Sequence, residues 1–182
     1  MRRADWQNRN GWWEYAGTDA QTAKEAVRYE GESLVPFAIE SSLSGVQRTF
    51  LPTDRLWYRR TFEIGPDWRS KRVLLHFGAV DYSCEVWVNN RLVGSHTGGN
   101  NPFGFAITEA LRKRGPQVLE LRVADPTATE PITRGKQPLT QKGVRYTPGS
   151  GIGKTVWREA VGPTPVWRDP REAAAGPAAV TA

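Results

Sequence analysis

The chain has 182 residues, a formal net charge of +6 and a single cysteine. Leu, Ile, Val and Phe make up only about a fifth of the residues, near the lower limit for globular proteins, so we expect one domain with a modest core. The sequence has no apolar run long enough for a membrane span or a secretory signal, and one cysteine excludes an internal disulfide, which favours a cytoplasmic location.

Most of the chain is expected to form short β-strands, and only residues 19–27 carry a weak helical pattern. Apolar and polar residues alternate with the period of a half-buried strand in four segments, residues 57–64, 73–77, 84–89 and 119–123. A single helical turn is expected at residues 108–111. Short strands at near-regular spacing predict an all-β fold, an antiparallel β-sandwich.

The clearest local prediction is a hairpin. Every second residue from Cys84 to Val88 is apolar, so these residues share the inward face of a strand. Asn89 and Asn90 follow as a two-residue turn, because Asn tolerates the positive φ angles that tight hairpin turns require. Residues 91–94 then return as the partner strand.

Several longer motifs follow one another along the chain. They are ADWQNRNGWWEY (4–15), VPFAIESSLSGV (35–46), LWYRRTFEI (56–64), LLHFGAVDYSCEVWVNNRLVGSHTGGNNPFGFAIT (74–108) and GVRYTPGSGI (143–152). In this order they resemble the N-terminal sugar-binding domain of glycoside hydrolase family 2, which includes β-galactosidases and β-glucuronidases. The resemblance implies a jelly-roll sandwich over residues 1–161 and, as partner, a carbohydrate of the β-galactoside or β-glucuronide type.

The resemblance also implies that catalysis takes place elsewhere. In that family the two catalytic glutamates lie on a (β/α)8 barrel, which alone takes about 250 residues. We therefore expect no catalytic residue here and no activity from this chain alone. It would support a catalytic partner chain or be the remnant of a truncated gene; a stand-alone lectin-like carbohydrate-binding module is the alternative.

A substitute catalytic pair would need two carboxylates held across a cleft, as in glycosidases. Most of the 19 Asp and Glu residues are expected to face solvent. Examples are Glu63, Asp67, Glu85 and Glu120. Glu40 and Asp81 are the exceptions, since each lies beside a turn inside a family-like motif. An inward carboxylate that accepts backbone N–H bonds is at least as good an interpretation of them as a catalytic group.

The best candidates for sugar contact lie in the loop Ser95–Phe103. Its glycines let the backbone approach a ligand closely, and its His and Asn side chains match sugar hydroxyls. The candidates are His96, Gly98, Gly99, Asn100 and Asn101. A turn capped by Asn is the equally weighted alternative.

A second candidate patch comprises Arg134, Lys136 and Gln137. Trp87 is added because it lies on the polar face of its strand, although a Trp in a strand is more often packed in a core. An isolated domain would present only one wall of a sugar pocket, so we expect millimolar or weaker affinity.

The segment GSGIGKT, residues 149–155, has features of a phosphate-binding loop. That pattern requires glycine where Pro148 stands, and the flanking residues are typical of strands instead of a helix. We therefore do not predict nucleotide binding.

The same region departs from the family pattern. Arg145, Gly153, Lys154 and Arg158 stand where members usually carry Trp, Trp, Gln and Leu. Because three of these changes remove large apolar groups, we expect weaker packing there.

The basic residues offer a third, less favoured function. Basic domains often bind nucleic acid, and this chain has two groups of basic residues that are close in sequence. The first comprises Arg55, Arg59, Arg60, Arg69, Lys71 and Arg72, and the second comprises Arg112, Lys113 and Arg114. No recognised nucleic-acid motif accompanies them, so a solvated basic face is the simpler interpretation.

Metal and cofactor binding are not predicted, because His76, His96 and Cys84 form no recognisable ligand spacing. Residues 162–182 are predicted to be a disordered tail, since twelve of these 21 residues are Ala, Gly or Pro.

Overall fold

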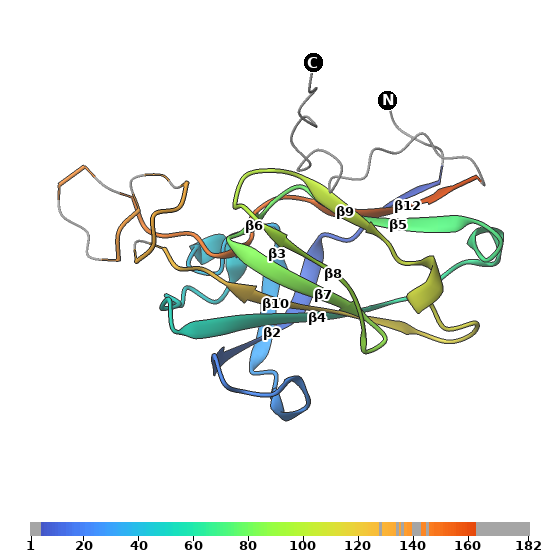
Figure 1. Cartoon of the computed structure of the whole chain (residues 1–182), viewed down its shortest axis with the longest axis horizontal. Coiled ribbons are helices and arrows are strands. Elements are labelled where there is room, and N and C mark those ends of the chain that lie inside the picture. The colour runs from blue at the N-terminus through green and yellow to red at the C-terminus, as the bar shows by residue number, and fades with distance from the viewer. Residues whose placement is uncertain are drawn as a thin grey trace, which may run out of the picture.

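Two antiparallel sheets, packed face to face, build the domain (Figure 1). The computed structural model describes residues 5–127, 129–133, 135, 137–139, 143, 144 and 146–162. Its strands are β1 (Trp6–Asn8), β2 (Gly11–Asp19), β3 (Gly31–Val35), β4 (Asp54–Phe62), β5 (Arg72–Phe77), β6 (Val80–Asp81), β7 (Ser83–Val88), β8 (Arg91–Thr97), β9 (Phe103–Ala106), β10 (Gln117–Ala124), β11 (Gly151–Ile152) and β12 (Val156–Val161). Four 3-10 helices connect them: η1 (Lys24–Ala26), η2 (Ser42–Ser44), η3 (Pro66–Trp68) and η4 (Thr108–Ala110).

One sheet has four strands in the order β1-β12-β5-β9, and the other has six in the order β3-β2-β4-β10-β7-β8. The short pair β11-β6 lies at one end of the sandwich. Every pairing in the described part of the chain is antiparallel. The predicted antiparallel β-sandwich is confirmed.

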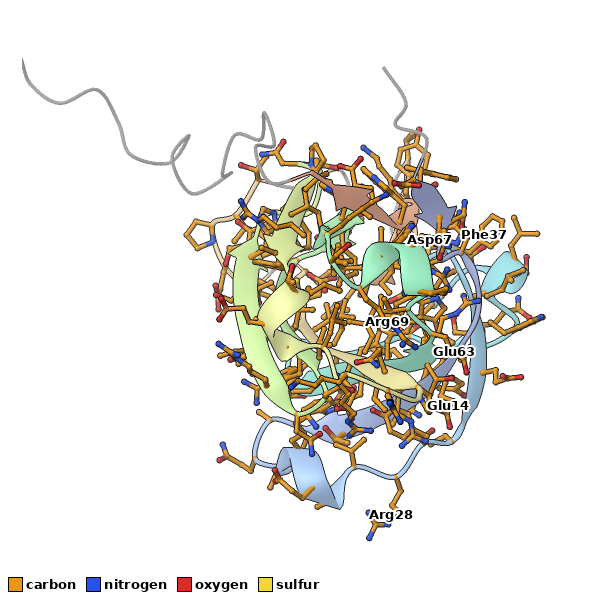
Figure 2. The ribbon with its side chains drawn as sticks, turned by 90° about the vertical axis from the view of Figure 1, so that its right-hand side faces the viewer. Glu14, Arg28, Phe37, Glu63, Asp67 and Arg69 are labelled. Atoms are coloured by element: carbon orange, nitrogen blue, oxygen red, sulfur yellow. The ribbon has the colours of Figure 1, made fainter. Side chains whose placement is uncertain are left out.

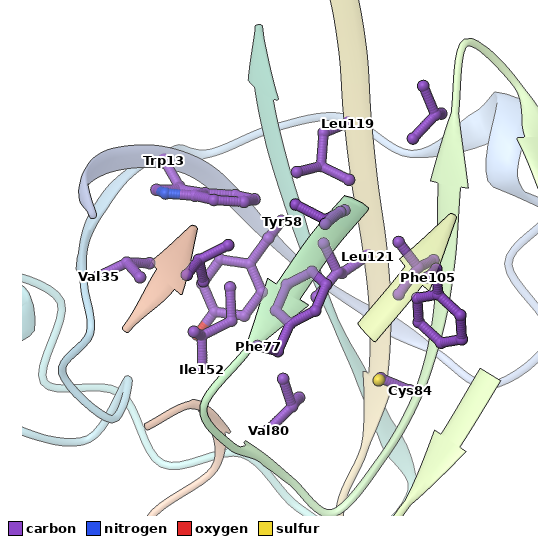
Figure 3. Close-up of a cluster of buried hydrophobic side chains, with 14 of the residues drawn as sticks. Trp13, Val35, Tyr58, Phe77, Val80, Cys84, Phe105, Leu119, Leu121 and Ile152 are labelled. Atoms are coloured by element: carbon purple, nitrogen blue, oxygen red, sulfur yellow. The ribbon is translucent and has the colours of Figure 1, made fainter. Parts of the chain in front are cut away.

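The main core lies between the two sheets (Figure 3). Its largest fully buried members include Trp13, Tyr58 and Phe77. Leu119 and Leu121 of β10 reach the same core from the centre of the six-stranded sheet. The predicted alternation of apolar and polar residues along this strand thus matches side chains that point alternately into the core and to the outer face of the sheet.

A second, smaller core lies on the outer face of the six-stranded sheet. Ala16, Val27 and Trp57 form it, with Tyr29 and Trp87 packed against them. The connection between β2 and β3 supplies Val27 and Tyr29, so this connection folds back over the sheet. Both faces of the sheet are therefore partly covered.

The hairpin prediction is confirmed. Cys84, Val86 and Val88 are buried, and Asn89 and Asn90 adopt φ angles of 52° and 67°. The return strand is longer than predicted, because pairing with β7 continues to Thr97. In the expected helical stretch near residues 19–27 only η1 forms, whereas the expected turn at 108–111 contains η4.

Glu120 contradicts its prediction as a solvent-facing carboxylate. It is only 8% exposed, its Oε2 lies 2.5 Å from Lys24 Nζ, and its Oε1 accepts a hydrogen bond from Tyr29 Oη at 3.3 Å. The residue does lie on the outer face of β10. The β2–β3 connection covers that face, so the same segment that buries Glu120 also supplies its partners.

Arg158 also differs from expectation, because it fills space in the interior. It is 3% exposed, and its guanidinium lies 4.6 Å from the ring centre of Phe62 and 5.1 Å from that of Trp68. Its Nη2 donates to Gln7 Oε1 at 2.6 Å. An arginine can pack in the interior in this way because its long side chain has an apolar stem.

No helix in the described part of the chain is long and apolar enough to cross a membrane. Strand β12 ends at Val161. Of the predicted tail 162–182, all but Gly162 lies outside the described residues, so the domain boundary stays a prediction.

Candidate functional site

The loop after β8 lies at the left-hand end of the sandwich in Figure 1. Its backbone packs closely against the carboxylate of Asp81, the last residue of β6. Gly98 has a φ of 125°, and its N–H donates to Tyr82 O at 3.0 Å. A Cβ on Gly99 would lie 2.3 Å from Asp81 Oδ1. Both glycines are thus required by backbone geometry: Gly98 by its positive φ, Gly99 by its close approach to the carboxylate.

His96 contacts this loop at two points. Its ring stacks on Phe103 with centroids 4.0 Å apart, and its Nε2 lies 3.2 Å from Gly98 O. Burial lowers the pKa of the imidazole, an effect partly opposed by the Gly98 carbonyl. His96 and Ser95 belong to β8, so the predicted loop Ser95–Phe103 is corrected: its first three residues are strand.

Asn100 and Asn101 are exposed at the tip of the loop. Their side-chain amides form no hydrogen bond within the described part of the chain. Lys154, from the β11–β12 connection, donates to Asn100 O at 3.4 Å. The tip of the loop therefore presents the side-chain amides of Asn100 and Asn101, which are free to bind a ligand, beside the exposed ammonium of Lys154.

Asp81 links the loop to the second predicted patch. Burial raises the pKa of its carboxyl to about 6, and the nearby charges of Asp125 and Glu40 act in the same direction. A hydrogen bond from the Gln137 side chain opposes this rise. Gln137, from the second predicted patch, thus lies beside Asp81, whereas Arg134 and Lys136 lie outside the described residues.

Two further acidic groups lie near Asp81: Asp125, which is buried, and Glu40, which is half-buried. Ser150 holds both: its hydroxyl donates to Asp125 Oδ2 at 2.8 Å, and its N–H donates to Glu40 Oε2 at 2.9 Å. Thr127 N donates to the other oxygen of Asp125 at 2.6 Å. Burial raises the pKa of Glu40. These contacts match the interpretation of Glu40 as an inward carboxylate held by backbone N–H groups.

The sequence prediction missed Asp125 and Ser150. One local signal pointed to Asp125, because Asp-Pro follows a strand directly and Asp accepts N–H bonds two residues ahead. Ser150 has no comparable signal, since its partners lie 25 and 110 residues away in the sequence.

Trp87 does not join this site. Its indole stacks on Trp57 with centroids 5.7 Å apart, in the second core on the outer face of the six-stranded sheet. His96 pairs with Cys84, whose side chain faces the main core, so His96 and Trp87 lie on opposite faces of the sheet.

The segment 149–155 does not form a phosphate cradle. Gly151 and Ile152 pair with β6 as strand β11, and the chain continues into strand β12 instead of a helix. Gly153 and Lys154 are exposed, and Arg145 lies outside the described residues. Among the residues that the structure describes, no group of three or more His, Cys, Asp or Glu is placed to hold a metal ion.

Comparison with known proteins gives a consistent match. The model of the family "Glycosyl hydrolases family 2, sugar binding domain" matches residues 2–125. A β-galactosidase of Thermoanaerobacter pseudethanolicus is 31% identical over 110 residues, 59% of this chain and 14% of that protein. A β-glucuronidase of Bacteroides fragilis is 34% identical over 55 residues, 30% of this chain and 8% of that protein.

Solved structures share the fold. A β-glucuronidase from Ruminococcus gnavus, in complex with uronic deoxynojirimycin, superposes with a TM-score of 0.69 at 17% identity, over 88% of this chain and 30% of that one. A β-D-glucuronidase of Dictyoglomus thermophilum gives a TM-score of 0.64 at 21% identity, over 90% of this chain and 29% of that one. The chain thus spans less than a third of each of these relatives, and the matched family model covers more than half of the chain. By this measure the chain belongs to the sugar-binding domain family of the family 2 glycosyl hydrolases.

Proposed function

We propose that this domain is a non-catalytic carbohydrate-binding wall for β-galactosides or β-glucuronides. The observation that carries the proposal is the meeting of four chain segments at one end of the sandwich. The loop Gly98–Asn101, Asp81, Gln137 and Lys154 come together there, as described above. The relatives are a β-galactosidase and a β-glucuronidase, and their names supply the ligand class.

The chemistry of this end suits sugar hydroxyls. The amides of Asn100 and Asn101 each offer donors and an acceptor. Above pH 6 the Asp81 carboxylate is ionised and accepts hydrogen bonds only. A shallow, one-sided arrangement of this kind gives weak binding, in the millimolar range.

We further propose that the catalytic carboxylates come from another domain, on a partner chain or elsewhere in the assembly. Both oxygens of Asp125 are occupied by Thr127 and Ser150, so this carboxylate serves structure. Glu40 is likewise bound by Ser150. The cytoplasm is the location we propose, because the single cysteine, Cys84, is a buried free thiol.

Titration of the labelled protein with methyl β-galactoside and methyl β-glucuronide, followed by amide NMR shifts, tests the binding proposal. We expect saturable shifts at Gly98 to Asn101 with millimolar dissociation constants. Asn101→Ala should weaken binding, whereas Gln21→Ala, an exposed amide in the β2–β3 connection, should not. Shifts absent from this loop would contradict the proposal.

Lys154 is expected to favour binding of the glucuronide over binding of the galactoside. A glucuronide carries a carboxylate that an exposed ammonium can pair with, and a galactoside does not. Lys154→Gln should therefore weaken glucuronide binding by about threefold or more while galactoside binding changes little. Arg28→Gln, the same charge change at a remote exposed site, should leave both unchanged.

The alternative is a stand-alone lectin-like module. Calorimetry separates the two, because a self-sufficient lectin site would bind a sugar with sub-micromolar affinity. Such a result would replace the shared-wall proposal.

A further inference from the structure

A separate hollow of about 490 Å³ opens at the other end of the sandwich, the right-hand end in Figure 1. The β4–β5 connection forms one wall, with η3, and the β9–β10 connection forms the other, with η4. Figure 2 looks onto this end, with Glu63, Asp67 and Arg69 labelled. None of the residues lining the hollow belongs to the candidate sugar site.

The hollow brings together basic residues that lie about forty positions apart in the sequence. Five cations line it: Arg69, Lys71, Arg112, Lys113 and Arg114. The only carboxylates in its lining are Glu63 and Glu109, and Glu109 already lies 3.6 Å from Arg91 Nη2.

Most of these cations are available to a ligand. Lys71 Nζ lies 2.5 Å from Asp5 Oδ2 and is therefore paired. Within the described residues, the side chains of the other four form no ion pair and no hydrogen bond. Four unpaired cations beside one hollow create a positive potential that favours anions.

The wall that carries three of them is held rigidly by the buried amide of Gln117, which is 1% exposed. Its Oε1 accepts from Arg112 N and from Asn89 Nδ2, both at 2.7 Å. Its Nε2 donates to Gly115 O at 2.8 Å and to Arg112 O at 3.3 Å. One side chain thus fixes the turn on which Arg112, Lys113 and Arg114 stand, so a ligand would not have to order this backbone.

The hollow also has an apolar part. Ile64 and Leu111 line it and are half-buried, and the indole of Trp68 lies beneath at 6% exposure. Arg158 stacks on Trp68 from within, adding a further buried cation behind the hollow. A compact body with apolar surface and several anionic groups matches this lining.

We propose that this hollow binds a small polyanion, a molecule with two or more phosphate or sulfate groups on a compact body. The guanidinium groups supply forked donors for phosphate or sulfate oxygens, and the lysines supply point charges. The site is independent of sugar binding at the opposite end.

The test uses the full chain and amide NMR titrations with two probes, pyrophosphate and a disulfated disaccharide. We expect saturable shifts at Gly115 and at the Trp68 indole N–H. Arg112→Gln/Arg114→Gln should weaken binding about tenfold or more. Arg28→Gln lies outside the hollow and controls for the loss of positive charge.

Tighter binding of pyrophosphate identifies a phosphate ligand, and tighter binding of the disaccharide identifies a sulfated saccharide; either supports the proposal. Shifts that do not saturate, or an equal weakening by Arg28→Gln, would overturn it in favour of a diffuse ion atmosphere. A ten-nucleotide single-stranded DNA that binds more tightly than both probes, with shifts extending beyond the hollow, would also overturn it, in favour of a nucleic-acid surface.

Discussion

The hydroxyl of Ser150 donates a 2.8 Å hydrogen bond to the buried carboxylate of Asp125. Both residues are more than nine-tenths buried, so neither can exchange this bond for water. The contact ties the end of β10 to the segment before β11, and thereby supports Asp81 through the β6–β11 pair.

Ser150→Ala should therefore lower the free energy of unfolding by about 1.5–3 kcal/mol, because Asp125 Oδ2 would stay buried without its donor. Urea denaturation followed by tryptophan fluorescence measures this. Ser95→Ala, an exposed serine on β8, is the matched control and should change stability by less than about 0.5 kcal/mol. Equal stability of the two variants would show that the Ser150–Asp125 bond does not stabilise the fold.

Gly99→Ala tests the close approach of the loop to Asp81. The added methyl group would lie 2.3 Å from Asp81 Oδ1, so the loop or the carboxylate must move. We expect a loss of about 1–3 kcal/mol in stability and weaker sugar binding.

Gly153→Ala serves as the control for this change. No atom lies within 4 Å of the position that its Cβ would occupy. Stability and sugar binding should both stay at the native level. If Gly99→Ala behaves in the same way, the loop is free to move away from Asp81.

The features predicted well from the sequence depend on neighbouring residues. The alternation from Cys84 to Val88 follows from the two-residue period of a strand, and the turn at Asn89 and Asn90 follows from the φ angles that Asn tolerates. The positive φ of Gly98 and the close backbone approach at Gly99 follow in the same way from the conformational freedom of glycine, while their contact with a sugar stays a prediction.

The errors arise where distant segments meet. Glu120 was placed in solvent because its own strand puts it on the outer face, but the β2–β3 connection covers that face. Trp87 lies in the same covered region, and its contact with a sugar stays a prediction. The Asp125–Ser150 bond likewise joins positions 25 residues apart. No local sequence pattern predicts these contacts, because they depend on how the connections between strands fold back over the sheets.

Asp81 should give the protein a characteristic pH dependence. Its folded pKa is about 6, above the ordinary value of 3.8, so between these values the folded state holds the proton more tightly than the unfolded state. Its contribution to stability is therefore present below about pH 4 and is lost as the pH rises to about 6. Partial solvent access reduces the effect to about 1–2 kcal/mol.

Asp81→Asn removes this titration. The stability of the variant minus that of the native protein should rise by about 1–2 kcal/mol from pH 4 to pH 7, measured by urea denaturation at each pH. Asn101→Ala changes no titrating group at the same end of the sandwich, so its difference from the native protein should stay constant. A constant difference for Asp81→Asn as well would mean that Asp81 titrates alike in both states.

Substitutions of Arg158 can distinguish the effect of packing from the effect of a buried charge on stability. Burial, together with the charge of Arg9, lowers the pKa of its guanidinium to about 9, so the folded state holds this cation at a cost. Its guanidinium, however, packs against the rings of Phe62 and Trp68, and its nitrogens bond to Gln7 and to the carbonyl of Glu63.

Arg158→Met retains most of the stem and removes the charge near Arg9, and replacing a buried cation by an apolar group of similar size is often neutral or stabilising. We expect its free energy of unfolding to stay within about 1 kcal/mol of the native value, or to exceed it. Arg158→Ala leaves a cavity and should lose about 2–4 kcal/mol by the same urea measurement. Equal losses in both variants would show that the hydrogen bonds to Gln7 and Glu63, and not the packed stem, hold this part of the sandwich together.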